Sequence, residues 1–149
     1  MAATGPDPVT SAPGTALRRG AYHGYQWLLL AFVLLGVVQI FLAGLGVFRL
    51  QDQTLGGDGG DTAFAPHRAV GFTLAGIALL ILLLAVIARP GARAIAASAV
   101  LVVLTSLVQS LLAGLAEDHA LYGGLHAFDG LLILGIPAYL YLRSRRRAS

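Results

Sequence analysis

Cysteine and lysine are both absent from the 149 residues, and only 11% of the residues are charged. Without cysteine the chain has no disulfide, no thiolate metal site and no Cys-x-x-Cys redox motif. Any metal would therefore be held by histidine, by carboxylates or within a prosthetic group. Soluble domains carry charge on about a quarter of their residues, so the low charge excludes an ordinary soluble domain.

Sequence motifs of several large enzyme classes are also missing. The chain has no P-loop, no His-Glu-x-x-His and no Gly-x-Ser-x-Gly, which argues against nucleotide hydrolysis, zinc proteolysis and serine hydrolysis. What the chain has is apolar residues: 57% are hydrophobic and the mean hydropathy is +0.79. Its length suits one domain, and we expect one compact membrane domain.

The apolar residues are concentrated in four runs, at about 27–48, 69–88, 94–116 and 120–142. Each is close to the roughly 20 residues that a helix needs to cross a bilayer. They predict an all-α integral membrane four-helix bundle with up-down-up-down topology, spanning residues 21–143. Residues 1–20, rich in Pro, Gly, Ala, Ser and Thr, are expected to be a disordered tail, and 144–149 a basic tail.

Arginine placement predicts the orientation. Two arginines precede the first run, two lie between the second and third, and four follow the fourth, whereas only Arg49 and Arg68 lie on the other side. The positive-inside rule then places both termini in the cytoplasm, in what we expect to be a bacterial inner membrane. The terminal arginines are interpreted as a lipid-facing anchor rather than a nucleic-acid site. Aromatic residues at the same level suggest an interfacial belt: Tyr22, Tyr25, Trp27, Tyr139 and Tyr141.

An internal repeat carries most of the information. The string Gln-x-x-Leu-Ala-Gly-Leu begins at Gln39 in the first run and recurs at Gln109 in the third. His67 is followed by glycine after four and nine residues, and His126 has the same spacing. The chain is therefore interpreted as a duplicated two-helix hairpin with a pseudo-twofold axis along the membrane normal.

The repeat places two histidines opposite each other. In an up-down-up-down bundle the second and fourth helices are diagonal neighbours, so His67 and His126 would face each other near the outer end. Gly71 and Gly130, one turn deeper on the same faces, would leave room for a flat ligand. Two neutral imidazoles in an apolar slot suit a six-coordinate haem iron, whereas two ligands would leave a zinc or copper ion short.

Several polar residues near the histidines remain open to two interpretations. Gln39 and Gln109 either hydrogen-bond between helices, which we favour, or donate to a haem. Asp129, whose counterpart is Val70, either accepts a proton from an imidazole or forms a salt bridge with Arg68. His67 could also simply begin a helix behind Pro66. Four further glycines are expected either to pack helices or to serve the site: Gly44, Gly76, Gly114 and Gly135.

These residues resemble two membrane families. The strings Gln39–Gly46 and Gln109–Leu115, the pair His67-Arg68 and the pair Leu125-His126 resemble one four-helix half of the haem A synthase family. Over Trp27 to Leu142 the chain also resembles the DUF6220 family of short actinobacterial membrane proteins. The first resemblance implies histidines of the second and fourth helices paired on haem. In that family a carboxylate stands three residues before the second-helix histidine, but Phe64 occupies this position here.

The leading hypothesis is a small polytopic membrane protein that binds haem b between His67 and His126, for electron transfer or haem handling. Its partners would be the lipid bilayer and either a second copy or a membrane redox protein. The alternative is a cofactor-free module whose glycine strings serve assembly. A haem A synthase-type enzyme ranks third because the acid is missing, and short loops with few charges disfavour a transporter.

Overall fold

The computed structural model describes residues 13–51 and 59–146. Its elements are α1 (Pro13–Gln51), α2 (Gly59–Ala88), α3 (Ala92–Val103), the π-helix η2 (Leu104–Val108), α4 (Gln109–Leu115) and α5 (Ala120–Arg146). Because α3, η2 and α4 run on without a break, the chain has four helices long and apolar enough to cross a membrane. No strand occurs in the described ranges. The prediction of an all-helical membrane protein is confirmed.

The helices are longer than the predicted spans. α1 begins at Pro13, so residues 13–20, expected in the disordered tail, are helical, whereas residues 1–12 lie outside the described part. Proline suits a first helical position, and a formed helix gains one hydrogen bond per added residue. α2 begins at Gly59 and contains Pro66, so the idea that His67 starts a helix behind Pro66 is wrong. α5 extends to Arg146, into the expected basic tail, and residues 147–149 lie outside the described part.

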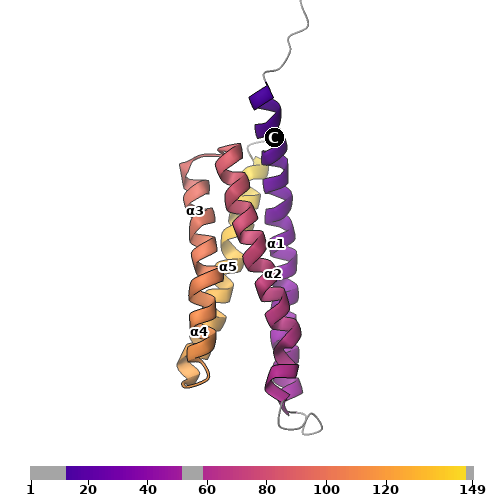
Figure 1. The fold of residues 1–149 in the computed structure, drawn as a ribbon, viewed down its shortest axis with the longest axis vertical. Coiled ribbons are helices and arrows are strands. Elements are labelled where there is room, and N and C mark those ends of the chain that lie inside the picture. Colours follow the sequence, from indigo (N-terminus) through magenta and orange to yellow (C-terminus); the bar gives the residue numbers. More distant parts are fainter. Residues whose placement is uncertain (1–12, 52–58, 147–149) are drawn as a thin grey trace, which may run out of the picture.

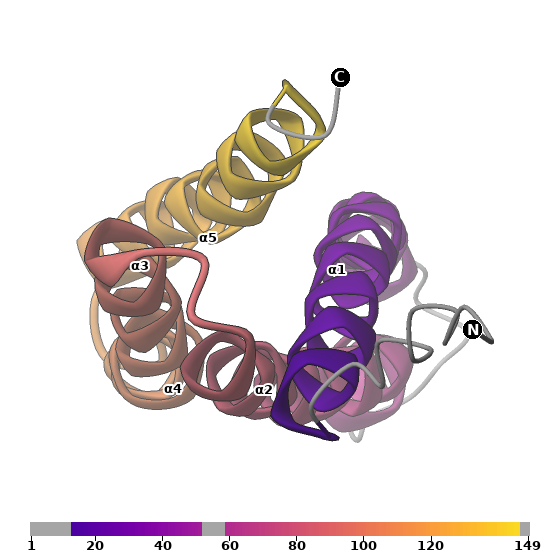
Figure 2. The ribbon, with the colours of Figure 1, turned by 90° about the horizontal axis from the view of Figure 1, so that it is seen from above.

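We call the four membrane-length helices rods, and the third rod is the continuous segment α3–η2–α4. The rods form two antiparallel hairpins, α1 with α2 and the third rod with α5 (Figure 1). Seen from above they follow one another around a ring, and α5 closes it by packing against α1 (Figure 2). Two hydrogen bonds join the start of α1 to the end of α5: Tyr22 Oη donates to Ser144 O at 3.3 Å, and Gln26 Nε2 donates to Ser144 Oγ at 3.1 Å. The arginine-rich ends of the first and last helices thus lie together.

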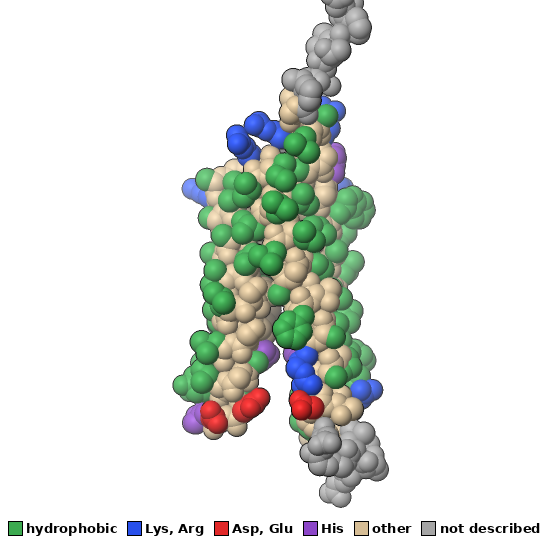
Figure 3. Space-filling model, viewed as in Figure 1, with side chains coloured by type: hydrophobic (Ala, Val, Ile, Leu, Met, Phe, Trp, Pro, Cys, Tyr) green, Lys and Arg blue, Asp and Glu red, His purple; other side chains and the backbone are tan. Residues whose placement is uncertain are grey.

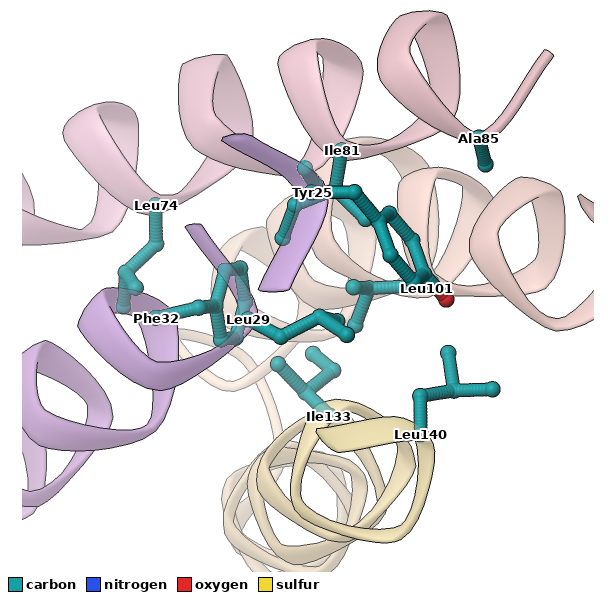
Figure 4. Close-up of a cluster of buried hydrophobic side chains, with 10 residues drawn as sticks. Tyr25, Leu29, Phe32, Leu74, Ile81, Ala85, Leu101, Ile133 and Leu140 are labelled. Carbon is teal, nitrogen blue, oxygen red and sulfur yellow. The ribbon is translucent and has the colours of Figure 1, made fainter. Parts of the chain in front are cut away.

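One buried stripe per rod forms the core, which Figure 4 shows as side chains converging between the helices. Buried positions on α2 and α5 recur at intervals of three and four residues, the spacing of a single helix face. Small side chains such as Ala78 and Ala85, both 0% exposed, allow close approach. The core comprises Tyr25, Leu29, Phe32, Leu74, Ala78, Ile81, Ala85, Leu101, Ile133 and Leu140.

The outer surface is apolar along most of the length of the bundle. Trp27 is 70% exposed and Phe72 76%. Figure 3 shows hydrophobic side chains covering the middle, arginines at both ends, and acidic side chains at the lower end. A continuous apolar surface of this kind suits contact with lipid rather than water. Trp27 and Tyr139 are exposed as an interfacial belt requires, but Tyr25 is buried, so its assignment to the belt is wrong.

Candidate functional site

His67 of α2 and His126 of α5 lie against each other. Their ring centroids are 6.2 Å apart and the ring planes are inclined by 55°. Both side chains are half-buried. The two residues come from different hairpins, so the folding of the whole bundle is what brings them together.

Each ring is oriented by a backbone carbonyl of its own hairpin. His67 Nδ1 lies 3.2 Å from Gln39 O, and His126 Nδ1 lies 3.2 Å from Gln109 O. A carbonyl oxygen only accepts, so Nδ1 carries the proton and donates in both bonds. In a neutral imidazole this leaves a lone pair on Nε2. Metal-ligating histidines use the same type of carbonyl partner to fix their tautomer.

The glutamine side chains occupy the space that was predicted for a ligand. Gln39 Nε2 lies 3.3 Å from His67 Nε2, and Gln109 Nε2 lies 3.2 Å from His126 Nε2. A Cβ at Gly71 would lie 3.2 Å from Gln39 Nε2, and one at Gly130 would lie 3.8 Å from Gln109 Nε2. The two glycines therefore make room for amides, and the prediction that they leave room for a flat ligand needs this correction.

Asp129 makes the two halves of the site different. In the orientation that satisfies its neighbours, the Gln109 amide nitrogen donates to Asp129 Oδ2 at 2.8 Å and its oxygen accepts from His126 Nε2 at 3.2 Å. The Gln109 amide then lies between the His126 ring and the Asp129 carboxylate and contacts both. In the first hairpin Val70 replaces the acid, and Gln39 Oε1 is buried without a hydrogen bond.

The contact between the two helices of each hairpin, on the outer side of the histidine, differs between the hairpins. Phe64, at the position where a carboxylate stands in the haem A synthase family, makes an edge contact with His67 at a centroid distance of 6.0 Å. Its ring fills the space beside Gly46, where a Cβ would come within 2.6 Å of it. In the second hairpin Gly123 faces Ala116 instead. Both pairs achieve close helix contact, but only the first puts an aromatic ring on its histidine.

Buried positions of α2 and α5 correspond over the second half of each helix. Four of the five buried α5 residues lie 59 positions after a buried α2 residue, and the same interval separates His67 from His126. The corresponding α5 residues are Ile133, Pro137, Leu140 and Ser144. The two helices thus present equivalent faces to the bundle, and the histidines lie on those faces.

The π-helix η2 corrects the register of the third rod. Ser98, Leu101 and Thr105 are buried and lie 69 positions after the buried residues Leu29, Phe32 and Gly36, whereas Gln109 lies 70 positions after Gln39. The second hairpin therefore has one extra residue between its core and its glutamine. η2 falls at this point (Leu104–Val108) and absorbs that residue, since a π-turn holds more residues than an α-turn. Gln109 keeps its direction toward His126 for this reason.

Other predicted residues lie away from the histidines. Arg68 is exposed and pairs with Asp61, with Nη2 at 3.3 Å from the carboxylate and 2.5 Å from Asp61 O, so the alternative of a salt bridge to Asp129 is wrong. A Cβ on any of four further glycines would meet nothing within 4 Å, so their expected packing role within this chain is not observed: Gly44, Gly76, Gly114 and Gly135.

Two further histidines have separate positions. His119 precedes α5 and its Nδ1 accepts from Leu121 N at 3.2 Å, which caps that helix. His23 is exposed on α1. Within the described residues no three histidine, cysteine or acidic side chains lie together as a metal-ion site would require. Among the described residues, the paired imidazoles of His67 and His126 are therefore the candidate for binding a metal-containing group.

Fold and site define a four-helix membrane protein with a paired histidine centre between two hairpins. Residues 39–117, just over half of the chain, match DUF6220, a family of unknown function, and the protein belongs to this family. The matching region contains Gln39, His67 and Gln109 but ends before His126. No curated protein and no solved structure matches the chain.

Proposed function

We propose that this protein binds one b-type haem between His67 and His126 in a bacterial inner membrane, for electron transfer or haem handling. One observation carries the proposal: the two imidazoles face each other with centroids 6.2 Å apart, and each has its Nδ1 committed to a backbone carbonyl. This combination leaves Nε2 as the ligand atom on both sides.

The residues present fit such a group. Metal–imidazole nitrogen bonds are about 2 Å long, so rings at this separation can hold one metal atom between them. The two hairpins also separate toward the acidic end of the bundle, and histidine side chains lie at the inner edge of the resulting gap (Figure 3).

In this proposal His67 and His126 would hold the haem iron, and the carbonyls of Gln39 and Gln109 would orient the two rings. The bound haem would supply reversible one-electron exchange. The amides of Gln39 and Gln109 would turn away from Nε2 and become donors to the ligand or to neighbouring helices. In that state the Gln109 amide would still donate to Asp129. The Gln39 amide has no such acceptor, because Val70 stands in place of the acid.

The wider architecture supports the same proposal. A duplicated hairpin explains why both histidines have the same partners, and the arginine placement favours cytoplasmic termini. The resemblance to the haem A synthase family implies paired histidines on the second and fourth helices. Phe64 in place of the acid argues against the synthase reaction, and Asp61, which is 93% exposed and paired with Arg68, does not replace it.

Absorption spectra of the detergent-purified protein test the proposal. From haem-replete cells we expect about one haem per chain, with sharp reduced α and Soret bands of a low-spin iron. His67→Ala and His126→Ala should each abolish these bands or convert them to high-spin spectra. His23→Ala is the matched control and should leave them intact. Full spectra in both single variants, or colourless protein that takes up no added haem, would overturn the proposal.

The alternative is a cofactor-free module that assembles with itself or with a partner. The observation that favours it is the open surface around Gly44 and Gly114, where small residues face outward and would allow a second helix to approach closely. This alternative predicts colourless protein and an oligomer that leucine at either glycine disrupts.

A further inference from the structure

A pocket of about 450 Å³ lies at the arginine-rich end, far from the histidines. α1, the loop between α2 and α3, and the end of α5 enclose it. Tyr25, Arg93, Tyr139 and Arg143 contribute polar groups to its wall, and none of the described residues that line it is acidic. The pocket is therefore cationic and suits an anion.

The N-terminus of α3 forms one wall of this pocket. Gly91, Ala92 and Ala94 line it beside Arg93, and no side chain caps the helix at Gly91. Gly91 has a φ of 126°, a conformation that glycine adopts readily. The first turn contains no acidic residue. The amides of Ala94 and Ile95 donate to Gly91 O, which leaves those of Ala92 and Arg93 and the positive end of the helix dipole for a ligand. Such an arrangement binds phosphate in many proteins.

Tyr25 supplies the second, independent observation. Its side chain is 1% exposed, yet its hydroxyl oxygen is buried without a hydrogen bond. Figure 4 shows this hydroxyl beside Leu101 and Leu140, and Leu140 lines the pocket with it. Ser98, its polar neighbour, donates its own proton to Ala94 O at 2.9 Å. The Ser98 oxygen is the acceptor beside this hydroxyl but does not form a full hydrogen bond with it. An unsatisfied buried donor is costly, so a ligand oxygen would complete it.

The two arginines face this pocket from different helices. Arg93 lies in the first turn of α3, and Arg143 lies in the last turns of α5, where its Nη1 donates to Tyr139 Oη at 2.8 Å. Trp27 and Tyr139 are largely exposed near this end, as expected at the headgroup level of a bilayer. A pocket at this level that combines guanidinium groups with a helix N-terminus matches the chemistry of phosphate.

We propose that this pocket binds a phosphate group, either that of an anionic phospholipid headgroup or free phosphate. Arg93 and Arg143 neutralise its charge, the first amides of α3 donate to its oxygens, and the Tyr25 hydroxyl donates from the buried side. The proposal does not depend on the histidine centre. Its ligand lies at the other end of the bundle and has a different charge.

Thermal unfolding of the detergent-purified full-length protein tests binding and separates the two sources. Short-chain phosphatidylglycerol, phosphatidylcholine and inorganic phosphate are titrated separately. A saturable rise in Tm with phosphatidylglycerol but not with phosphatidylcholine supports the lipid source, because ligand binding stabilises the folded state. A saturable rise with inorganic phosphate supports the free ion. No saturable rise with either anion would overturn the proposal.

Variants locate the binding. Arg93→Gln and Tyr25→Phe should each weaken the apparent affinity about tenfold, the effect of losing one hydrogen bond to a charged group. Tyr25→Phe removes only an unpartnered hydroxyl, so the variant should fold. Arg145→Gln removes the same charge from the same end outside the pocket and should change affinity less than twofold. Equal weakening by Arg145→Gln and Arg93→Gln would show general charge attraction and overturn the proposal.

Discussion

At the scale of single residues, the histidine centre depends on glutamines twice. The backbone carbonyls of Gln39 and Gln109 hold the rings through Nδ1, and their side chains reach Nε2. In each hairpin, one glutamine therefore fixes the tautomer of the histidine through Nδ1 and contacts its Nε2 as well. Asp129 is the point of difference, because only the second amide has a carboxylate within reach.

Asp129→Asn is expected to destabilise the protein by about 1.5–3 kcal/mol, since it removes a charged acceptor of a buried hydrogen bond. Thermal or denaturant unfolding in detergent measures the change. Asp61→Asn is the control at the same end of the bundle. Its carboxylate is 93% exposed in a surface ion pair and should be worth no more than about 1 kcal/mol. Equal losses in the two variants would contradict the Gln109–Asp129 bond.

Two glycines offer a matched comparison. Gly71→Ala places a Cβ 3.2 Å from Gln39 Nε2, so the amide must shift, whereas Gly130→Ala places it 3.8 Å from Gln109 Nε2, an ordinary contact. Both gain up to about 1 kcal/mol of helix propensity. We expect Gly71→Ala to be less stable than Gly130→Ala by about 1 kcal/mol, the worth of one hydrogen bond. Unfolding of both variants measures this difference, which would vanish if the amide were not bonded to His67.

At the scale of elements, the third rod directs both its buried stripe and its glutamine toward the bundle, as α1 does, although it has one more residue between them. η2 takes up that residue between Thr105 and Gln109, so the core stripe and the glutamine both keep their directions. Without the π-helix, an α-helix would rotate Gln109 by about 100° away from His126. The irregular segment is therefore a requirement of the site.

Deletion of Leu107, an exposed residue inside η2, should convert the rod to a regular α-helix and leave the protein folded. The remaining residues would then have the spacing of α1. Deletion of the exposed Leu34 in α1 is the matched control and should displace Gln39 from His67. Circular dichroism and Tm measure both. Equal damage from the two deletions would contradict the register argument.

At the scale of the whole molecule, the two hairpins share a core at the arginine-rich end and separate toward the acidic end (Figure 3). Tight packing therefore holds the hairpins together at one end, while the histidine pair lies between them nearer the other. The proposed haem site lies at the less packed end, where a bound group would not disturb the core. The phosphate pocket lies at the packed end and is bounded by three elements.

Gly114→Leu should leave the oligomeric state and the haem content unchanged, because a Cβ at this position meets nothing within 4 Å and the side chain would face lipid. Analytical ultracentrifugation in density-matched detergent measures the mass, and the Soret band measures the haem. Gly44→Leu provides the repeat-related comparison. Dissociation of an oligomer in either variant would favour the assembly module instead.

The sequence by itself determined the features that depend on local order along the chain. Long apolar runs dictate four membrane helices, because an unpaired backbone is costly in lipid. The repeated histidine spacing also indicated that His67 and His126 belong on equivalent faces, since residues at fixed intervals share a helix face. Family membership follows from the same kind of linear pattern.

Only the tertiary structure decided which neighbours those faces meet. Helix rotation and relative depth result from the packing of all four rods, and one extra residue changes them by a large angle. For this reason the sequence could not assign Gln39 to the space beside Gly71, or Asp129 to Gln109 rather than Arg68. Tyr25 illustrates the same limit: its position predicted an interfacial ring, but the rotation of α1 buries it beside the phosphate pocket.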